Sequence, residues 1–299
     1  IHLECNLTDT KAEEELLKNL EISHILTTSF SGIDSNDFML LASKRMNIYS
    51  YCYIQSWDNV SGNGYHLCKP NKVLSYSESM NKQLHMFQEL SSQNIIAVGA
   101  LQYASWANIS KEKNNKKNNF NVLYGGKSYK RFPFDHTYVE EIIRAFEVLK
   151  IDINLVVRPH PFALKKNFDG TFYYPQIDKL ISLTNKYEYI SIDLEKVSGD
   201  KFFRDRKTHI KYEDSNSFNK MRDRLLNYDL VINIFSTLAL EASLLNIPCI
   251  NIFYQTKDYK YLNHPSRANM FQDERQFHNR QLVDSIPNAD SFDALKKYI

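Results

Sequence analysis

The sequence predicts an α/β protein with two domains, each built on a parallel β-sheet flanked by helices. Three observations support this fold class. Short apolar strands alternate with helices over short connections, which is the pattern of βαβ units. This alternation stops at the polar stretch 107–119 and then starts again. The chain has 299 residues, which is long enough for two domains of ordinary size.

The clearest βαβ unit covers Asp229–Tyr254. Leu230–Ile234 is a short apolar run, as expected of a parallel strand covered on both faces. Ser236 is a good N-cap for the apolar helix that follows, and we expect that helix to have almost no solvent-exposed face. Pro248 stops the helix, and Cys249–Phe253 forms the next buried strand.

The chain before the polar stretch shows the same alternation of strands and helices. Its short connections predict a parallel sheet. The expected strands are 24–28, 47–55, 73–76 and 94–98, and the expected helices are 11–20, 37–44 and 78–90.

Residues 107–119 carry no periodicity and almost no apolar side chain, so we expect a domain linker there. We place the N-terminal domain at 1–107, the linker at 108–119 and the C-terminal domain at 120–299. Residues 193–215 are charged and irregular and are predicted to form a long excursion. In the C-terminal domain the expected strands are 120–124, 153–157, 189–192, 230–234 and 249–253, and the expected helices are 136–149, 176–184, 217–227, 236–245 and 292–298.

The composition, with 43% hydrophobic and 24% charged residues, is that of a soluble globular protein. The formal net charge of +2 is too small to indicate a nucleic-acid-binding surface. No run approaches the roughly 20 apolar residues that span a bilayer, and no signal peptide is visible. Cys52 and Cys249 lie in apolar strands, which favours buried thiols and a reducing, cytosolic compartment. The eight glycines form no Walker loop and no GxGxxG motif.

Three strand ends of the C-terminal domain carry residue types that bind anions. In a doubly wound sheet, ligands bind beyond the carboxyl ends of the strands. Gly125–Ser128 offers backbone donors and a cation, Arg158–Pro161 offers an imidazole, and Ser236-Thr237 offers a helix N-terminus. A lone His-Pro turn is more often structural, but these neighbours favour binding of a diphosphate. The candidate residues are Gly125, Gly126, Lys127, Ser128, Arg158, His160, Pro161, Ser236 and Thr237.

Glu241 falls in the second turn of the apolar helix, where a free carboxylate is costly. A capping box would place the carboxylate at position 239, which is an alanine. Glu241 therefore needs another partner. One alternative is the hydroxyl pair of a ribose; the other is that Glu241 faces a rim or pairs with an arginine.

The N-terminal domain also has two polar strand ends, Thr27-Thr-Ser29 and Ser56-Trp-Asp-Asn59. Asp58 follows an aromatic residue, and in an interdomain cleft its pKa would rise, so that it could act as a general base. The alternative is an aspartate that caps a helix or a turn. The candidates for contacts with the substrate that such a base would deprotonate are Thr28, Ser29, Trp57 and Asn59.

These motifs resemble those of GT-B glycosyltransferases, in which two Rossmann-like domains face each other across a cleft. The resemblance covers most of residues 22–254 and rests on Thr27-Thr-Ser29, Ser56-Trp-Asp-Asn59, Arg158-Pro-His-Pro161 and Ser236-Thr-x-x-x-Glu241-Ala. The His-Pro and Ser-Thr pairing looks most like the branch with bacterial sialyltransferases, capsule Kdo transferases and CDP-glycerol glycerophosphotransferases. The segment before the linker is shorter than a full acceptor domain and lacks a recognisable first strand and glycine loop. We therefore expect an incomplete N-terminal domain.

The resemblance implies a role for each motif. His160, Ser236 and Thr237 would hold the donor phosphates. Glu241 would hold the ribose, and Asp58 would be the base. Enzymes of this branch need no metal in the active site, which agrees with the absence of a DxD motif from the sequence.

We therefore expect a metal-independent glycosyltransferase that moves a sugar from a CMP-, CDP- or UDP-linked donor to a surface-glycan or lipid-linked acceptor. The expected partners are these two substrates, with no cofactor and no nucleic acid. Association with the inner face of the membrane or with a glycan-assembly complex would suit such an acceptor. Two alternatives remain: a UDP-sugar 2-epimerase-like isomerase, and a non-catalytic module that binds nucleotide or glycan.

Overall fold

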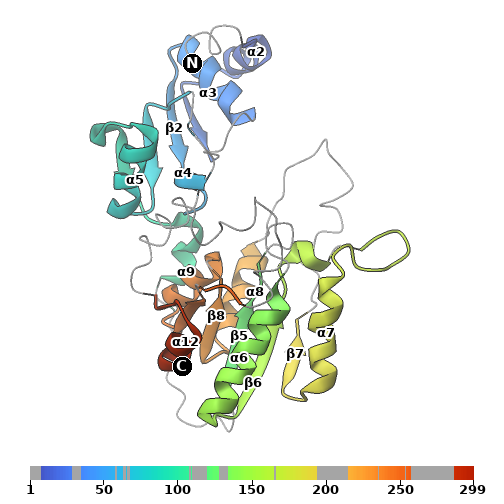
Figure 1. Cartoon of the computed structure of the whole chain (residues 1–299). Coiled ribbons are helices and arrows are strands. Elements are labelled where there is room, and N and C mark those ends of the chain that lie inside the picture. Colours follow the sequence, from blue (N-terminus) through green and yellow to red (C-terminus); the bar gives the residue numbers. More distant parts are fainter. Residues whose placement is uncertain are drawn as a thin grey trace. The chain divides into compact units, whose positions relative to one another are not determined.

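The computed structural model confirms the α/β fold class, with two parallel sheets flanked by helices. It describes residues 8–28, 35–57, 59–62, 65, 68–107, 109, 120–127, 134–164, 166–193, 215–234, 236–252, 254–256 and 286–299. The described residues form two compact units, one up to Ser105 and one from Trp106 onward (Figure 1).

The first unit contains a four-stranded parallel sheet in the order β1-β2-β3-β4. Each strand pairs with its successor in sequence, so right-handed crossovers put the connecting helices on one face. The strands are β1 (His24–Thr27), β2 (Tyr49–Tyr53), β3 (Lys72–Ser75) and β4 (Ile95–Ala97). The helices are α2 (Lys11–Asn19), α3 (Ser35–Arg45), α4 (Asn59–Gly62) and α5 (Glu78–Gln88), with the 3-10 helices η1 (Ser92–Asn94) and η2 (Leu101–Trp106).

The helix-covered face of the first sheet holds the core of this unit. Cys52 and Val73 of the strands and Met80 and Leu84 of α5 are at most 1% exposed. Ser77 caps α5, because its Oγ accepts a hydrogen bond of 3.3 Å from the backbone N of Met80. All three strand pairings are parallel, so the carboxyl ends of the four strands lie along one edge of the sheet.

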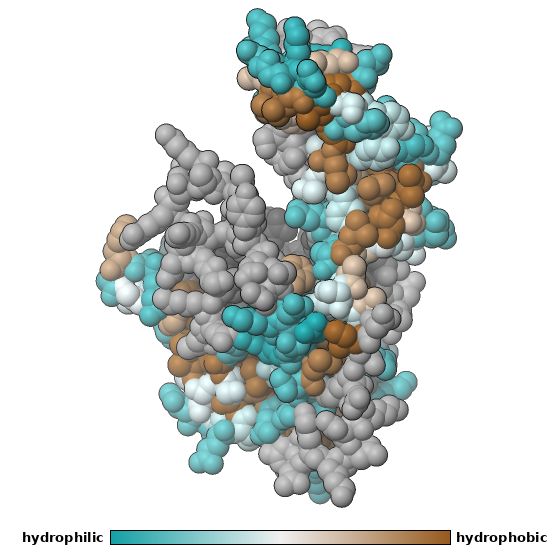
Figure 2. Space-filling model, turned by 180° about the vertical axis from the view of Figure 1, so that it is seen from behind, coloured by the Kyte–Doolittle hydropathy of each residue, from teal (hydrophilic) through white to brown (hydrophobic). Residues whose placement is uncertain are grey.

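The opposite face of the first sheet is more exposed. Strand register places Leu26, Tyr51 and Ile96 on that face. Leu26 is 61% and Ile96 is 43% exposed. Figure 2 shows hydrophobic residues at several places on the surface of this unit. Apolar side chains of the sheet therefore remain in contact with solvent.

The second unit contains a six-stranded parallel sheet in the order β10-β9-β8-β5-β6-β7. Numbered from the unit's first strand and read from the β7 edge, this is the doubly wound order 3-2-1-4-5-6. The strands are β5 (Phe120–Gly125), β6 (Ile153–Arg158), β7 (Ile190–Ile192), β8 (Leu230–Asn233), β9 (Cys249–Ile252) and β10 (Asn288–Ala289). The helices are α6 (Asp135–Leu149), η3 (Pro161–Leu164), α7 (Gln176–Lys186), α8 (Ser215–Leu225), α9 (Thr237–Leu244) and α12 (Phe292–Tyr298).

Helices cover both faces of the second sheet (Figure 1). On one face, α6 contacts α7 and α12, and alternate strand residues such as Val122 and Tyr124 join the same apolar cluster. The residues between them point to the opposite face, where α9 contacts β8 and β9. Leu123 and Val231 are fully buried there. Burial on both faces explains why these strands are almost continuously apolar.

The strands and helices predicted from the sequence match these bounds to within about two residues. The two-residue strand β10, the short helix α4 and the 3-10 helices η1, η2 and η3 were not predicted. The expectation that α9 has almost no exposed face is wrong for Leu244, which is 44% exposed. Cys52 and Cys249 are buried free thiols, as predicted.

Only Ile109 of the predicted linker is described, and residues 194–214 of the predicted excursion lie outside the described residues. None of the described helices is long and apolar enough to cross a membrane.

Candidate functional site

The candidate site lies at the carboxyl ends of β6, β5 and β8, which are neighbours in the middle of the second sheet. Gly125, the last residue of β5, is in register with Arg158 of β6 and with Asn233 of β8. The chain order reverses between β5 and β8, and a doubly wound sheet binds its ligand beyond the strands at such a reversal. The fold thus brings the three predicted anion-binding strand ends together.

The loop after β5 packs closely against its surroundings. A Cβ atom on Gly125 would overlap the side chain of Leu238, and one on Gly126 would overlap the carboxyl group of Asp135. The backbone N of Gly126 donates to the carbonyl oxygen of Arg158 at 2.8 Å. The backbone N of Lys127 donates to Asp135 Oδ1 at 3.2 Å. Two amides expected to cradle a phosphate therefore bond within the protein, which leaves the Lys127 side chain as the loop's described ligand group; Ser128 lies outside the described residues.

His160 follows β6 and lies just before η3, where its carbonyl oxygen accepts a hydrogen bond of 2.7 Å from the backbone N of Ala163. Pro161 is the first residue of η3. Burial, and in second place the positive charge of Lys127, lower the pKa of the His160 imidazole from its ordinary value. The imidazole is therefore neutral near pH 7 and can donate one hydrogen bond to an anion. Lys127 follows β5 and His160 follows the adjacent strand β6, and the charge of the lysine reaches the imidazole.

This depressed pKa predicts a stability loss in acid. An unfolded histidine titrates near about pH 6.5, so the unfolded state binds a proton there that folded His160 does not. His160 contributes stability above that pH and loses it as the pH falls towards the folded-state pKa. We expect the wild-type free energy of unfolding to fall more than that of His160→Gln between about pH 7 and about pH 5 in urea titrations. Equal pH slopes in the two proteins would contradict the assignment.

Arg158 ends β6 and contacts the sulfur of Met221 on α8. Burial lowers the pKa of its guanidinium from the ordinary value, while the charge of Asp193 raises it, Arg224 lowers it and Glu241 raises it. The net direction is downward, so two acidic neighbours do not fully replace the lost solvation. An anionic ligand would be stabilised beside this side chain.

Glu241 is partly buried on α9 and interacts electrostatically with Arg158. Asp193 itself pairs with Arg224, whose Nη1 lies 2.8 Å from Asp193 Oδ2. This charge interaction supports the arginine alternative for Glu241. It does not exclude the ribose alternative, because a carboxylate has several acceptor positions.

Ser236 occupies the N-cap position of α9 with extended backbone angles, as predicted, but its side chain makes no capping hydrogen bond. Instead its backbone N donates to Asn233 Oδ1 at 2.9 Å. The Ser236 Oγ is buried and makes no hydrogen bond within the part of the chain that the structure describes. Such a hydroxyl is suited to a ligand oxygen. Thr237 is the first residue of α9, so both hydroxyls stand at the helix N-terminus.

Asn233 is a site residue that the sequence analysis missed. It is fully buried at the end of β8, and its Nδ2 donates to the sulfur of Cys249 at 3.2 Å. Its Oδ1 holds the backbone of Ser236, so it fixes the turn from β8 into α9. Burial raises the pKa of the Cys249 thiol to about 12, which makes it unreactive. The signal available in the sequence was a single amide in the otherwise apolar run Leu230–Asn233.

The described acceptor-side candidates Thr28, Trp57 and Asn59 follow β1 and β2 of the first sheet in the chain. Asp58 and Ser29 lie outside the described residues, so the structure does not place the predicted base. Thr28 is exposed just after β1. Asn59 is the first residue of α4, and its backbone N donates to the carbonyl oxygen of Ser56 at 3.1 Å. Trp57 is only 7% exposed, so its ring mainly packs inside the protein.

The carboxyl edge of the first sheet carries a hydrogen-bond network that the sequence did not reveal. Tyr53 OH donates to Gln102 Oε1 at 2.5 Å and accepts from the backbone N of Leu101 at 2.7 Å. Gln102 Nε2 donates to Tyr76 OH and, at 3.2 Å, to the carbonyl oxygen of Gln55. Burial raises the pKa of Tyr53, so it stays a neutral phenol. The network ties together the loops that follow β2, β3 and β4.

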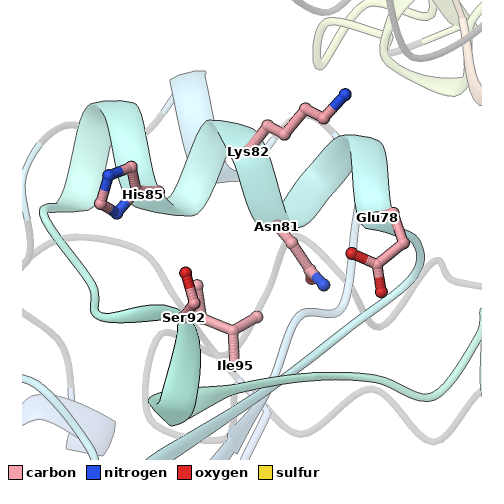
Figure 3. A pocket seen from close by; sticks show the side chains of 6 residues that line it. All are labelled: Glu78, Asn81, Lys82, His85, Ser92 and Ile95. Atoms are coloured by element: carbon pink, nitrogen blue, oxygen red, sulfur yellow. The ribbon is translucent and has the colours of Figure 1, made fainter.

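A pocket of about 310 Å³ lies elsewhere in the first unit, between α5 and the η1 region (Figure 3). Its lining residues are Glu78, Asn81, Lys82, His85, Ser92 and Ile95. Most of these side chains are exposed, and His85 Nδ1 is already 2.9 Å from the carbonyl oxygen of Leu90. The pocket includes none of the predicted site residues, and we assign it no function.

No metal ligand set is found among the described residues, since no group of three His, Cys, Asp or Glu side chains there could hold an ion.

The comparisons with known proteins concern the fold. No family model matches the chain, and no curated protein matches it in sequence.

The structure of UDP-GlcNAc 2-epimerase from Methanocaldococcus jannaschii is similar, with a TM-score of 0.53, 11% identity, and coverage of 97% of this chain and 72% of that one. MurG from Acinetobacter baumannii gives a TM-score of 0.50, 11% identity, and coverage of 99% and 70%. The fold is GT-B-like.

A putative UDP-N-acetylglucosamine 2-epimerase from Listeria monocytogenes matches the same GT-B-like fold, with a TM-score of 0.50, 12% identity, and coverage of 96% and 76%. At these identities the similarity establishes the fold and not the reaction.

Proposed function

We propose that the chain is a glycosyltransferase that uses a nucleotide-activated sugar and binds the donor at the carboxyl edge of β5, β6 and β8. The observation that carries this proposal is the convergence of Lys127, His160 and the N-terminus of α9 at the point where the strand order reverses. A cation, a neutral imidazole and a helix N-terminus together suit a phosphate group.

In the proposed reaction, Asp58 removes the proton from an acceptor hydroxyl, and the acceptor oxygen attacks the anomeric carbon of the donor sugar. The bond from that carbon to the phosphate oxygen breaks, and the leaving nucleotide keeps the electron pair. Lys127, His160 and Arg158 stabilise the charge that grows on the phosphate. Such fixed groups can stabilise the transition state without a metal.

Ser236 Oγ and the first turn of α9 complete the proposed phosphate contacts. Glu241 holds the donor ribose from the next turn of the helix, with Arg158 near its carboxylate. We propose CMP, CDP or UDP as the nucleotide and a glycan or lipid-linked molecule as the acceptor. The support for these nucleotides and acceptors is the resemblance of the His160-Pro161 turn combined with Ser236-Thr237 to the branch of bacterial sialyltransferases, capsule Kdo transferases and CDP-glycerol glycerophosphotransferases.

A second candidate is isomerisation of a UDP-sugar. It is favoured by the similar solved structures, because those of Methanocaldococcus jannaschii and Listeria monocytogenes are named UDP-GlcNAc 2-epimerases and one of them was solved with UDP-GlcNAc and UDP. An epimerase needs acid and base groups at the sugar itself. Of the described carboxylates near the site, Asp135 and Asp193 bond within the protein, and Glu241 is the proposed ribose ligand.

The two reactions differ in whether they need an acceptor. We expect the protein to release nucleotide from a CMP-, CDP- or UDP-sugar only when a glycan or lipid-linked acceptor is added. Conversion of a UDP-sugar to its 2-epimer without acceptor would establish the second candidate instead. Nucleotide binding with neither reaction, across a donor and acceptor panel, would leave a binding module and refute the transferase proposal.

The ribose assignment predicts a selective effect of Glu241→Gln. A hydrogen bond to a charged acceptor contributes about 1.5–3 kcal/mol, so we expect a loss of about 10- to 100-fold in nucleoside diphosphate affinity. Inorganic pyrophosphate has no ribose, so its affinity should change much less. Calorimetric titration of both ligands measures the difference. An equal loss for both would show that Glu241 acts through Arg158 and the phosphates.

A further inference from the structure

We propose that Asp135 is a positioning residue of this site: its buried carboxyl group anchors the loop after β5 and so holds Lys127 beside His160. The catalytic consequence of this anchor rests on the proposed function. The anchoring itself does not, because it is a property of the protein without ligand.

Asp135 is the first residue of α6 and is fully buried. Its Oδ1 accepts a hydrogen bond of 2.9 Å from the hydroxyl of Tyr124 and one of 3.2 Å from the backbone N of Lys127. Tyr124 is itself fully buried near the end of β5. One oxygen atom therefore links the helix, the strand and the loop. Burying a carboxyl group costs free energy, and these bonds offset the cost only while the loop stays in place.

Gly126 connects the start of the loop to the end of β6, opposite the carboxyl group of Asp135. Its backbone N donates to the carbonyl oxygen of Arg158 at 2.8 Å, and a Cβ atom there would overlap the carboxyl group of Asp135. Gly126 thus lies between the first residue of α6 and the end of β6, with no room for a larger side chain. Lys127 is the next residue, and its own backbone N is held by Asp135.

The position of Lys127 matters because its charge acts on His160. That charge is the second cause, after burial, of the lowered pKa of the His160 imidazole. A neutral imidazole can donate one hydrogen bond to a phosphate, while the lysine beside it supplies the positive charge. Release of the loop would let the lysine move away into solvent. Asp135 would then influence His160 without contacting a substrate.

The test measures the pKa of His160 by NMR in the ligand-free protein, with His160→Gln used to assign its signal. We expect Asp135→Ala to raise this pKa, because the loop no longer holds Lys127 close. Lys127→Met should raise it as well, and Asp135→Ala should add nothing in the Lys127→Met background. Loss of a negative charge would by itself lower the pKa of a nearby histidine, so an upward shift cannot come from the missing carboxylate.

Two further variants separate anchoring from simple destabilisation. Asp135→Asn keeps a side-chain oxygen that can accept both hydrogen bonds, so it should not produce the upward shift. Thr137→Val changes a side chain of the same first turn that is only 4% exposed and bonds to Phe134 and Thr256, not to Gly126 or Lys127. It should leave the pKa of His160 unchanged, even if it lowers the melting temperature.

An unchanged pKa of His160 in folded Asp135→Ala would overturn the proposal, as would the same upward shift in Thr137→Val. If Asp135→Ala does not fold, Gly126→Ala replaces it, because the added Cβ would overlap the Asp135 carboxyl group and displace the loop from it. An upward shift in Gly126→Ala supports the anchor, and its absence counts against it. Titration with UDP, CDP and CMP then tests the link to function. We expect Asp135→Ala and Lys127→Met to lose affinity together; a protein that binds none of these nucleotides but shows the pKa shifts would refute the proposed function alone.

Discussion

His160→Ala is expected to lower kcat of the proposed transferase about 10²- to 10³-fold, the usual loss when one fixed donor to a developing oxyanion is removed. His160 follows β6, next to the strand β5, at the edge where the leaving phosphate would gain charge. Burial and Lys127 keep it neutral, so it donates a hydrogen bond that strengthens as the transition state forms. The measurement is steady-state turnover of a nucleotide-sugar with acceptor.

The melting temperature of His160→Ala should stay close to that of the wild type, because the side chain lies at the end of a strand and not in the apolar cluster of the second unit. His160→Gln keeps an N–H donor and should recover part of the activity. His24→Ala, at an exposed histidine of the first unit, is the control. Near-native turnover of folded His160→Ala would refute the phosphate assignment.

Arg158→Met is expected to weaken nucleoside diphosphate binding about 10- to 100-fold, since a charge-assisted hydrogen bond contributes about 1.5–3 kcal/mol. Met is apolar and of similar length, so it can fill the space beside Met221 without the charge. Its effect should also grow at low salt, because Arg158 lies among Asp193, Arg224 and Glu241 and its loss leaves an excess of negative charge. Calorimetric titration at two salt concentrations measures both effects.

Arg144→Met provides the matched control for this prediction. Arg144 lies on α6 of the same unit and forms an ion pair with Glu141, with half of its side chain exposed. Its removal takes away one positive charge without touching the strand ends, so nucleotide affinity should change little. If Arg144→Met and Arg158→Met weaken binding equally, the effect is one of net charge and Arg158 has no specific role.

Most of the fold could be predicted from local patterns. Leu230–Ile234 and Cys249–Phe253 are apolar because both faces of their strands are covered, and this pattern is visible without coordinates. Strand ends, caps and prolines set the element boundaries to within a few residues. The order of strands in the second sheet is different, because it depends on which neighbours each strand finds in three dimensions. The short strand β10 carries too few residues to show any periodicity.

The site was predictable at the level of residue type. A glycine pair, a His-Pro turn and a Ser-Thr helix start each follow an apolar strand, and parallel strands bring such ends to one edge. What could not be predicted is how these groups are held. In the sequence, Asp135 is an ordinary acidic residue at a helix start. The Ser236 hydroxyl does not cap α9 as expected; Ser236 is instead held through its backbone N by Asn233 Oδ1. The network of Tyr53 with Gln102 joins residues far apart in sequence, so no spacing signals it.

The most direct test of the central claim is an NMR titration of His160 with UDP, CDP, CMP and GDP. If the edge of β5, β6 and β8 binds the donor phosphates, at least one nucleotide will shift the His160 signal and raise its pKa, because a bound anion favours the protonated imidazole. The affinity from that shift should match the affinity from calorimetry, and Lys127→Met should weaken both. A nucleotide that binds without changing the pKa of His160, or no binding by any of the four, would contradict the account.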